Sequence, residues 1–344
     1  MTLIHTSSPH TGRPGHVGGV MRQVILATLP GLAALVWYFG WGPLVNVLWA
    51  SVLALVFEAA VIKLRRRPVA FYLKDYSAVL TAVLLGLALP PYTPWWVTLV
   101  GMFVAIVLAK QLYGGLGQNP FNPAMVGYAL LLIAFPVQMT QWAPPVSLSG
   151  DNPGLLATLK VIFELTPLPD AFTHATPLDT FKNKGALTQE ELWAQVAGLK
   201  DSFGAWQAVS LAYLLGGLYL LVRRIITWHI PVAILFALFM VSGFFYGSDP
   251  SNFAPPLFHL TMGATMLGAF FIATDPATAA TSNKGKLVYG FCIGLLIYII
   301  RSWGNYPDAV AFAVLLMNLA VPFLDYYTRP RTYGHKKANK GIRG

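Results

Sequence analysis

Long apolar stretches alternate with short polar ones along most of the chain. About ten of them approach the roughly 20 mostly apolar residues that a membrane-spanning helix requires. The lipid interior offers no partner for free backbone N–H and C=O groups, so each stretch is predicted to be α-helical. The predicted spans are 22–40, 43–62, 77–91, 95–112, 124–142, 206–222, 228–247, 258–274, 287–301 and 307–327.

Composition agrees with this pattern. The 344 residues are 56% hydrophobic and only 10% charged, whereas soluble domains carry roughly 25% charged residues. A single core cannot bury that much apolar surface, so most of it must face lipid. The predicted fold class is therefore an all-α integral membrane protein.

The distribution of positive charge predicts the orientation. Lys and Arg gather in short cytoplasmic loops of membrane proteins. If the N-terminus is cytoplasmic, the ten spans place 18 of the 23 basic residues on the cytoplasmic side. This arrangement predicts two cytoplasmic termini and a lipid bilayer as partner, and it argues against nucleic-acid binding. The five basic residues on the opposite side are Lys160, Lys182, Lys184, Lys200 and Arg301.

One long segment, 143–205, is too polar to span a membrane and contains most of the acidic residues. The topology places it outside the cytoplasm, and loops of this length are usually functional. It divides the chain into five predicted parts. These are the N-terminal segment 1–21, five helices in 22–142, the extracytoplasmic segment 143–205, five helices in 206–327, and the basic tail 328–344.

Two stretches resemble each other at an offset of 184 residues, 123–132 and 307–316, and an Asn-containing turn precedes each. Five spans per unit would invert the second unit relative to the first, as in many transporters whose site lies between inverted repeats. The turns at Gly114–Pro123 and Trp303–Asp308 are either interruptions of membrane helices or ordinary tight loops.

Four acidic residues lie in or beside predicted spans, where ionisable side chains are often functional. Glu58 and Asp325 are close in sequence to basic residues, Lys63–Arg67 and Arg329, which favours structural ion pairs. Asp275 and Asp308 occupy comparable positions in the two halves. Each either caps a helix N-terminus or takes part in an ion path.

His229 and His259 are isolated near span starts, and haem ligation is a weaker interpretation than packing. Cys292 is the only cysteine, so it cannot form an internal disulfide. No cluster of cysteine and histidine suggests a metal site.

The run from Asp170 to Asp179 is, on physical grounds alone, a polar turn. It resembles the D-x-x-(S/T)-G-A-(T/S) motif at which a flavin transferase links FMN to threonine through a phosphoester. Thr176 is the expected attachment residue, and His174 stands where the motif has glycine, which permits positive φ. The candidate flavin-binding residues are Asp170, Thr173, His174, Ala175, Thr176, Pro177, Leu178 and Asp179.

Three further runs resemble one protein family: Gly114–Ala124, Ala273–Pro276 and Tyr306–Ala313. The family contains the D subunit of the Rnf electron-transport complex and the B subunit of the sodium-pumping NADH:quinone oxidoreductase. The short N-terminus is more similar to the Rnf type.

This resemblance implies ten helices in two inverted five-helix repeats, similar to urea transporters, in the bacterial inner membrane. It implies a six-subunit complex that couples ferredoxin and NAD redox to Na⁺ or H⁺ movement, with a second FMN-bearing subunit. Covalent FMN on Thr176 and a non-covalent riboflavin are the implied cofactors. The chain has no Gly-rich dinucleotide fingerprint, so it is not expected to be catalytic alone.

Three functions remain open from the sequence. The first is a redox subunit that relays electrons through FMN, with Asp275 and Asp308 as candidate ion-path acids. The second is a stand-alone transporter or channel without a cofactor. The third is a structural anchor for redox partners.

Overall fold

A computed structural model describes residues 17–149, 153–167, 173–185, 187–196, 198–306 and 308–330. Apart from an isolated bridge between Trp142 and His174, the secondary structure of these residues is helical. Asp170 lies outside the described residues.

The first half of the chain begins with two long helices, followed by shorter ones. A π-helix, η1, continues α5, and Asn122 caps the start of α6 by accepting a hydrogen bond from the Met125 N–H. The elements are α1 (Val17–Phe39), α2 (Gly42–Leu64), α3 (Val69–Leu73), α4 (Ser77–Ala88), α5 (Trp95–Phe103), η1 (Val104–Gln111), α6 (Pro123–Ala134) and α7 (Pro136–Thr140).

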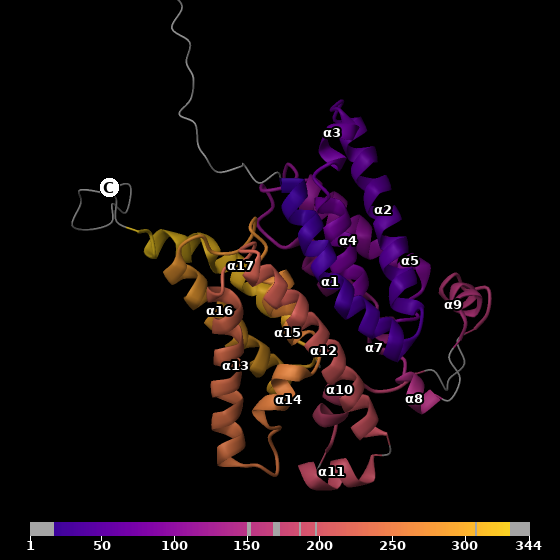
Figure 1. Ribbon diagram of the computed structural model, residues 1–344, viewed down its shortest axis with the longest axis vertical. Coiled ribbons are helices and arrows are strands. Elements are labelled where there is room, and N and C mark those ends of the chain that lie inside the picture. The colour runs from indigo at the N-terminus through magenta and orange to yellow at the C-terminus, as the bar shows by residue number, and fades with distance from the viewer. Residues whose placement is uncertain are drawn as a thin grey trace, which may run out of the picture.

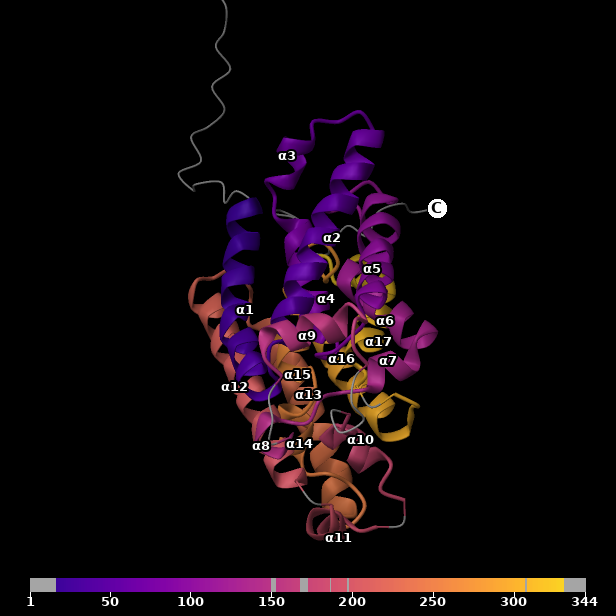
Figure 2. The ribbon, with the colours of Figure 1, turned by 90° about the vertical axis from the view of Figure 1, so that its right-hand side faces the viewer.

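Short helices make up the polar middle segment. They are α8 (Val146–Ser149), α9 (Leu155–Ile162), α10 (Pro177–Lys182) and α11 (Gln189–Gln195). Figures 1 and 2 show α3 at one end of the molecule and α11 at the other. The start of α1 lies toward the α3 end (Figure 1).

The second half contains the remaining long helices and one broken helix. The elements are α12 (Leu199–Val222), α13 (His229–Ser248), α14 (Pro256–Thr261), α15 (Thr265–Leu267), the π-helix η3 (Gly268–Ile272), α16 (Asn283–Trp303) and α17 (Val310–Tyr327). Helix α12 begins seven residues before the span predicted from hydropathy.

Six of the described helices are long and apolar enough to cross a membrane: α1, α2, α12, α13, α16 and α17. Three more apolar helices are shorter: Ser77–Ala88, Trp95–Gln111 and Pro123–Ala134. The predicted span 258–274 is helical on both sides of a break at Met262–Ala264. The interruption therefore lies within this span, and the turns before α6 and α17 are loops that connect consecutive helices.

The halves lie side by side, with α1 against α12 (Figure 1) and α6 against α17 (Figure 2). Small residues permit the close approach of α1 and α12. A Cβ added to Gly216 would lie 2.0 Å from the Ala27 carbonyl oxygen. Large apolar residues remain exposed on the outer faces, for example Leu48, Val52 and Val56 on α2, as expected for a surface that faces lipid.

Candidate functional site

Thr176, the predicted attachment residue, is the N-cap of α10. Its Oγ1 accepts a hydrogen bond from the Asp179 N–H at 3.2 Å and donates one to Asp179 Oδ2 at 2.9 Å. Pro177 occupies the first helical position, where no backbone N–H is needed. These contacts fix the hydroxyl at the start of the helix.

Two residues before Thr176, His174 forms an isolated backbone bridge with Trp142. The His174 N–H donates to the Trp142 carbonyl at 2.7 Å. Positive φ among described non-glycine residues is confined to Arg66, Tyr76, Glu164 and Arg224. His174 therefore needs none of glycine's conformational freedom here. Thr173 and Ala175 are exposed, while Pro177 and Leu178 are buried.

Thr176 opens onto a pocket between the two halves of the molecule, which we call the Thr176 pocket. It contains about 990 Å³ of space free of protein atoms, part of it open to solvent. Its lining is mostly apolar and aromatic. The lining includes the aromatic residues Tyr128 of α6, Trp142 before α8 and Trp206 of α12. It also includes Thr176 and Asp179 at the start of α10, and Gly263, Ala264 and Asp308.

Burial perturbs the charged groups on α10. Burial raises the pKa of Asp179, hydrogen bonds from Thr176 oppose this rise, and the nearby Asp308 adds to it. Burial also lowers the pKa of Lys182. The Lys182 ammonium donates to the Tyr306 carbonyl at 2.8 Å. Helix α10 is thereby attached to the loop before α17.

Asp308 lies in the Thr176 pocket, one residue before Ala309, the N-cap of α17. Its Oδ1 accepts hydrogen bonds from the Ala309 N–H at 2.8 Å and the Arg301 guanidinium at 3.0 Å. Its Oδ2 accepts from the Ala264 N–H at 2.7 Å. The carboxylate thus accepts hydrogen bonds from backbone N–H groups at the starts of α15 and α17 and is also paired with a cation.

Asp275 lies in a different pocket, which we call the Asn122 pocket, with about 1200 Å³ of free space, part of it open to solvent. Its carboxylate closes a local turn by accepting from the Thr278 hydroxyl at 3.0 Å. The Asn122 side chain in the same pocket donates to the Ile272 carbonyl at 3.3 Å, linking the two halves. The Asn119 Oδ1 atom is buried without a hydrogen-bond partner.

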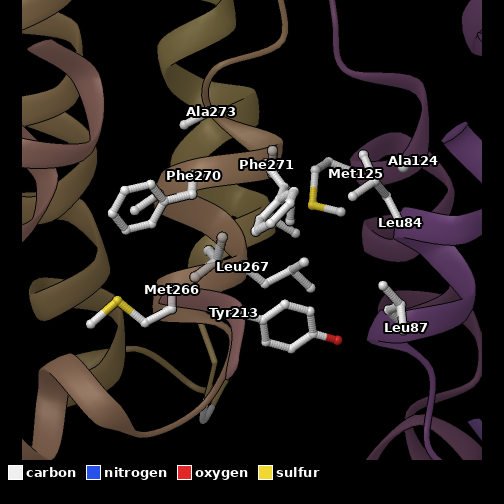
Figure 3. Close-up of a cluster of buried hydrophobic side chains, with 14 of the residues drawn as sticks. Leu84, Leu87, Ala124, Met125, Tyr213, Met266, Leu267, Phe270, Phe271 and Ala273 are labelled. Atoms are coloured by element: carbon white, nitrogen blue, oxygen red, sulfur yellow. The ribbon is translucent and has the colours of Figure 1, made fainter. Parts of the chain in front are cut away.

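An apolar layer lies where the two pockets approach each other. Figure 3 shows Leu84, Leu87 and Met125 from the first half facing Tyr213, Leu267 and Phe271 from the second. The Thr176 pocket includes Leu87, Met125 and Leu267, and the Asn122 pocket includes Leu84 and Phe271. The structure therefore does not bring Asp275 and Asp308 together.

A buried polar cluster borders the Asn122 pocket. Glu58 is in an ion pair, as the sequence suggested, but its partner is Lys110 rather than the Lys63–Arg67 cluster. Lys110 Nζ lies 2.6 Å from Glu58 Oε1, and both side chains are 2% exposed. The charge count places Lys110, near the end of the predicted span 95–112, on the cytoplasmic side. It is buried instead because Glu58 and Ser77 accept its hydrogen bonds.

The remaining ionisable candidates have structural contacts. Asp325 accepts from the Thr281 N–H at 2.9 Å, so the predicted pairing with Arg329 is wrong. Arg329 instead lies over the Tyr326 ring. His229 stacks on Trp228, and His259 packs against Tyr298.

Several residues of the Thr176 pocket were missed by sequence reasoning, among them Tyr128, Trp142 and Trp206. Aromatic residues are common near the ends of membrane helices, so none of the three stands out locally. Arg301, the last residue of the predicted span 287–301, is counted among the five basic residues outside the cytoplasm. Its proximity to an acid seven residues later, Asp308, was the available signal for an ion pair.

Comparisons with known proteins extend over nearly the whole chain. The sequence pattern of the NQR2, RnfD, RnfE family matches residues 4–334. The D subunit of the ion-translocating oxidoreductase complex of Alcanivorax borkumensis is 58% identical over 99% of both chains. The proteins of the same description from Ectopseudomonas mendocina and Cellvibrio japonicus are 56% and 53% identical. They cover 100% and 99% of this chain, and 99% and 97% of their own lengths.

Proposed function

Because the chain belongs to the NQR2, RnfD, RnfE family, we propose that it is a membrane subunit of an ion-translocating oxidoreductase complex of the Rnf type. In this proposal it carries FMN on Thr176, relays electrons between partner subunits and contributes to the path of Na⁺ or H⁺. The position of Thr176 supports the proposal, since it ends the acceptor-like motif and opens onto a pocket between the halves.

The residues of the Thr176 pocket suit a flavin. Trp142, Trp206 and Tyr128 supply flat apolar surfaces for an aromatic ring system. Thr176 supplies the hydroxyl for a phosphoester, and Lys182 is the nearest cation on the same helix. When bound, a flavin supplies one- and two-electron chemistry. The protein holds its attachment point and limits the access of water.

The Asn122 pocket is the better candidate for a second, non-covalent flavin such as riboflavin. Asn119 Oδ1 lacks a partner there, Asn122 and Lys110 add donors, and Leu84 and Phe271 add apolar surface. Hydroxyl or ring N–H groups of a ligand would donate to the Asn119 oxygen, which is costly to bury unpaired.

The order of elements supports ten spans in two inverted units. Helices α1, α2, α4, α5–η1 and α6 would correspond to α12, α13, α14–η3, α16 and α17. An odd number of spans per unit inverts the second one. In this arrangement the termini are cytoplasmic and α10 and α11 are extracytoplasmic. The ion would then pass the apolar layer between Asp275 and Asp308.

The proposal also names partners. The complex would have six subunits in a bacterial inner membrane, one of them a second FMN-bearing subunit. A flavin transferase would modify Thr176 during maturation.

Fluorescence of the denatured protein in a gel tests the flavin proposal. Protein purified from cells that contain the transferase should give a fluorescent band. Thr176→Ala should abolish it, since no hydroxyl remains for the ester, and Thr176→Ser should retain it. Thr180→Ala, on the same helix, is the matched control and should remain fluorescent.

A dark band from the fully processed native protein would contradict the flavin proposal and favour a transporter without a cofactor. Normal turnover of an assembled complex with Thr176→Ala would favour a structural anchor instead.

A further inference from the structure

The predicted span 258–274 is broken where α14 ends and α15 begins. Gly263, between them, has φ of +65°. A break inside a membrane helix leaves carbonyl groups on one side and N–H groups on the other without intrahelical partners. Lipid cannot satisfy these groups, so the protein must.

Two charged side chains satisfy the break. Arg301, 5% exposed, donates to the carbonyl oxygens of His259 at 2.8 Å and Met262 at 3.2 Å. Asp308 accepts from the Ala264 N–H at 2.7 Å. The cation thus lies at the C-terminal end of α14 and the carboxylate at the N-terminal end of α15, in the sense that the helix dipoles favour.

Helix α10 packs directly on this break. A Cβ added to Gly263 would lie 2.6 Å from Leu178 Cδ1, 2.8 Å from Asp308 Oδ2 and 2.9 Å from an Arg301 nitrogen. Leu178 is two residues beyond Thr176 and is 7% exposed. The absence of a side chain at Gly263 therefore lets Leu178, Asp308 and Arg301 converge.

The same break leads into the apolar layer. Leu267 lies at the end of α15, and η3 continues directly to Phe271. Both side chains face Met125 of the first half (Figure 3). A shift of the break relative to α10 would move these side chains, because only a few helical residues separate them from Ala264.

We infer that the break at Met262–Ala264, held by Arg301 and Asp308, transmits a movement of α10 to the apolar layer. Leu178 and Arg301 act as positioning residues. A change in charge beside Thr176 would act on Asp308, which lines the same pocket. Asp308 in turn holds the start of α15. This inference rests on the proposed function, since it assigns the coupling of electron transfer to ion movement to one contact.

Purified complex in sealed vesicles provides the test, with Leu178→Ala and Arg301→Lys as variants. Lysine retains the charge but lacks the planar fork that serves three acceptors at once. Leu156→Ala is the control, because that leucine belongs to the same polar segment and is 76% exposed. Three quantities are measured: gel fluorescence, NADH-dependent electron transfer, and the rate of membrane-potential formation from a potential-sensitive dye.

Both variants should retain fluorescence, and Arg301→Lys, whose side chain is not among the lining residues of the Thr176 pocket, should also retain most electron transfer. The potential formed per electron should fall about fivefold or more, the lower end of typical coupling between sites. The control should match the native complex. If Leu178→Ala fails to assemble, Leu178→Met, which retains an apolar contact, should assemble and show a smaller fall in the same ratio.

An unchanged ratio in fluorescent Leu178 and Arg301 variants would overturn the inference and leave the proposed function intact. A parallel fall in electron transfer and potential formation would also overturn it. That result would indicate that the contact between α10 and the break only stabilises the structure. A dark band from the native complex would instead count against flavin attachment.

Discussion

The Thr176 hydroxyl is at once a helix cap and the proposed acceptor of a phosphoester. An ester at Oγ1 would remove the hydrogen bond that this atom donates to Asp179. The phosphate would also place negative charge next to the Asp179 carboxylate. Attachment is therefore expected to alter the ionisation of Asp179.

This leads to a pH prediction for Asp179 in protein made without the transferase. Burial raises the pKa of Asp179 above its usual value of 3.8. The pKa of this carboxyl is therefore higher in the folded than in the unfolded protein. Its favourable contribution to the free energy of unfolding is complete below about pH 4 and is lost as the pH rises through the folded-state pKa. Asp179→Asn, which can still accept from Thr176, avoids this loss.

The melting temperature of Asp179→Asn, relative to that of the native protein, should therefore increase as the pH rises from about 4 toward 7. A dye that becomes fluorescent on reaction with Cys292 can follow unfolding, because this is the only cysteine. Asp201→Asn, an exposed acid on α12, serves as control. Parallel pH curves for Asp179→Asn and the native protein would contradict the prediction.

At the scale of elements, a buried ion pair joins α2 to η1. In η1, Lys110 and Gln111 both donate to Glu58 Oε1, at 2.6 and 2.7 Å. Such π-helical turns are uncommon and are often found at functional sites. Arg65, at the end of α2, in turn donates to the Gln111 carbonyl.

Removing one partner of this pair leaves an unpaired buried charge. Glu58→Met or Lys110→Met alone should therefore destabilise the protein by about 3–5 kcal/mol. The double variant should recover most of that loss, since two apolar side chains would then face each other. Equilibrium unfolding in mixed detergent micelles measures the three values, and exposed Lys63→Met is the control. Additive single effects would contradict the prediction.

Elements were largely predictable from sequence, and their contacts were not. Each of the ten predicted stretches is mostly helical where the structure describes it, because long apolar runs have few alternatives in lipid. Six of these helices are long and apolar enough to cross a membrane. The break at Met262–Ala264 has no local signal beyond one glycine, since its partners, Arg301 and Asp308, lie in a distant part of the sequence. For the same reason Lys110 could not be matched to Glu58. Thr176 was found by a motif, whereas its pocket depends on helices from both halves.

At the scale of the whole molecule, the distribution of basic residues still favours cytoplasmic termini when the two buried basic residues are left out. Removal of the buried Lys110 and Arg301 from the count leaves 17 basic residues on the predicted cytoplasmic side and 4 on the other. Arg66 and Arg67 are exposed and precede α3 in the sequence. Figure 1 shows α3 at the end of the molecule opposite α11.

Single-cysteine labelling tests this orientation in a Cys292→Ser background. A cysteine in place of Lys184 should react with a membrane-impermeant maleimide applied to the outside of intact cells, once the outer membrane is made permeable. A cysteine in place of Lys63 should react only after the inner membrane is opened. The reverse pattern would contradict the charge argument.

The attachments on either side of Thr176 affect how electrons could travel. The backbone bridge from His174 to Trp142 holds one side, and the bond from Lys182 to Tyr306 holds the other. A group fastened at this threonine would therefore have a fixed anchor instead of a swinging arm. Tunnelling rates decay steeply with distance, so a redox partner would have to bring its own cofactor to that anchor. The timing of electron delivery would then depend on the docking of that partner.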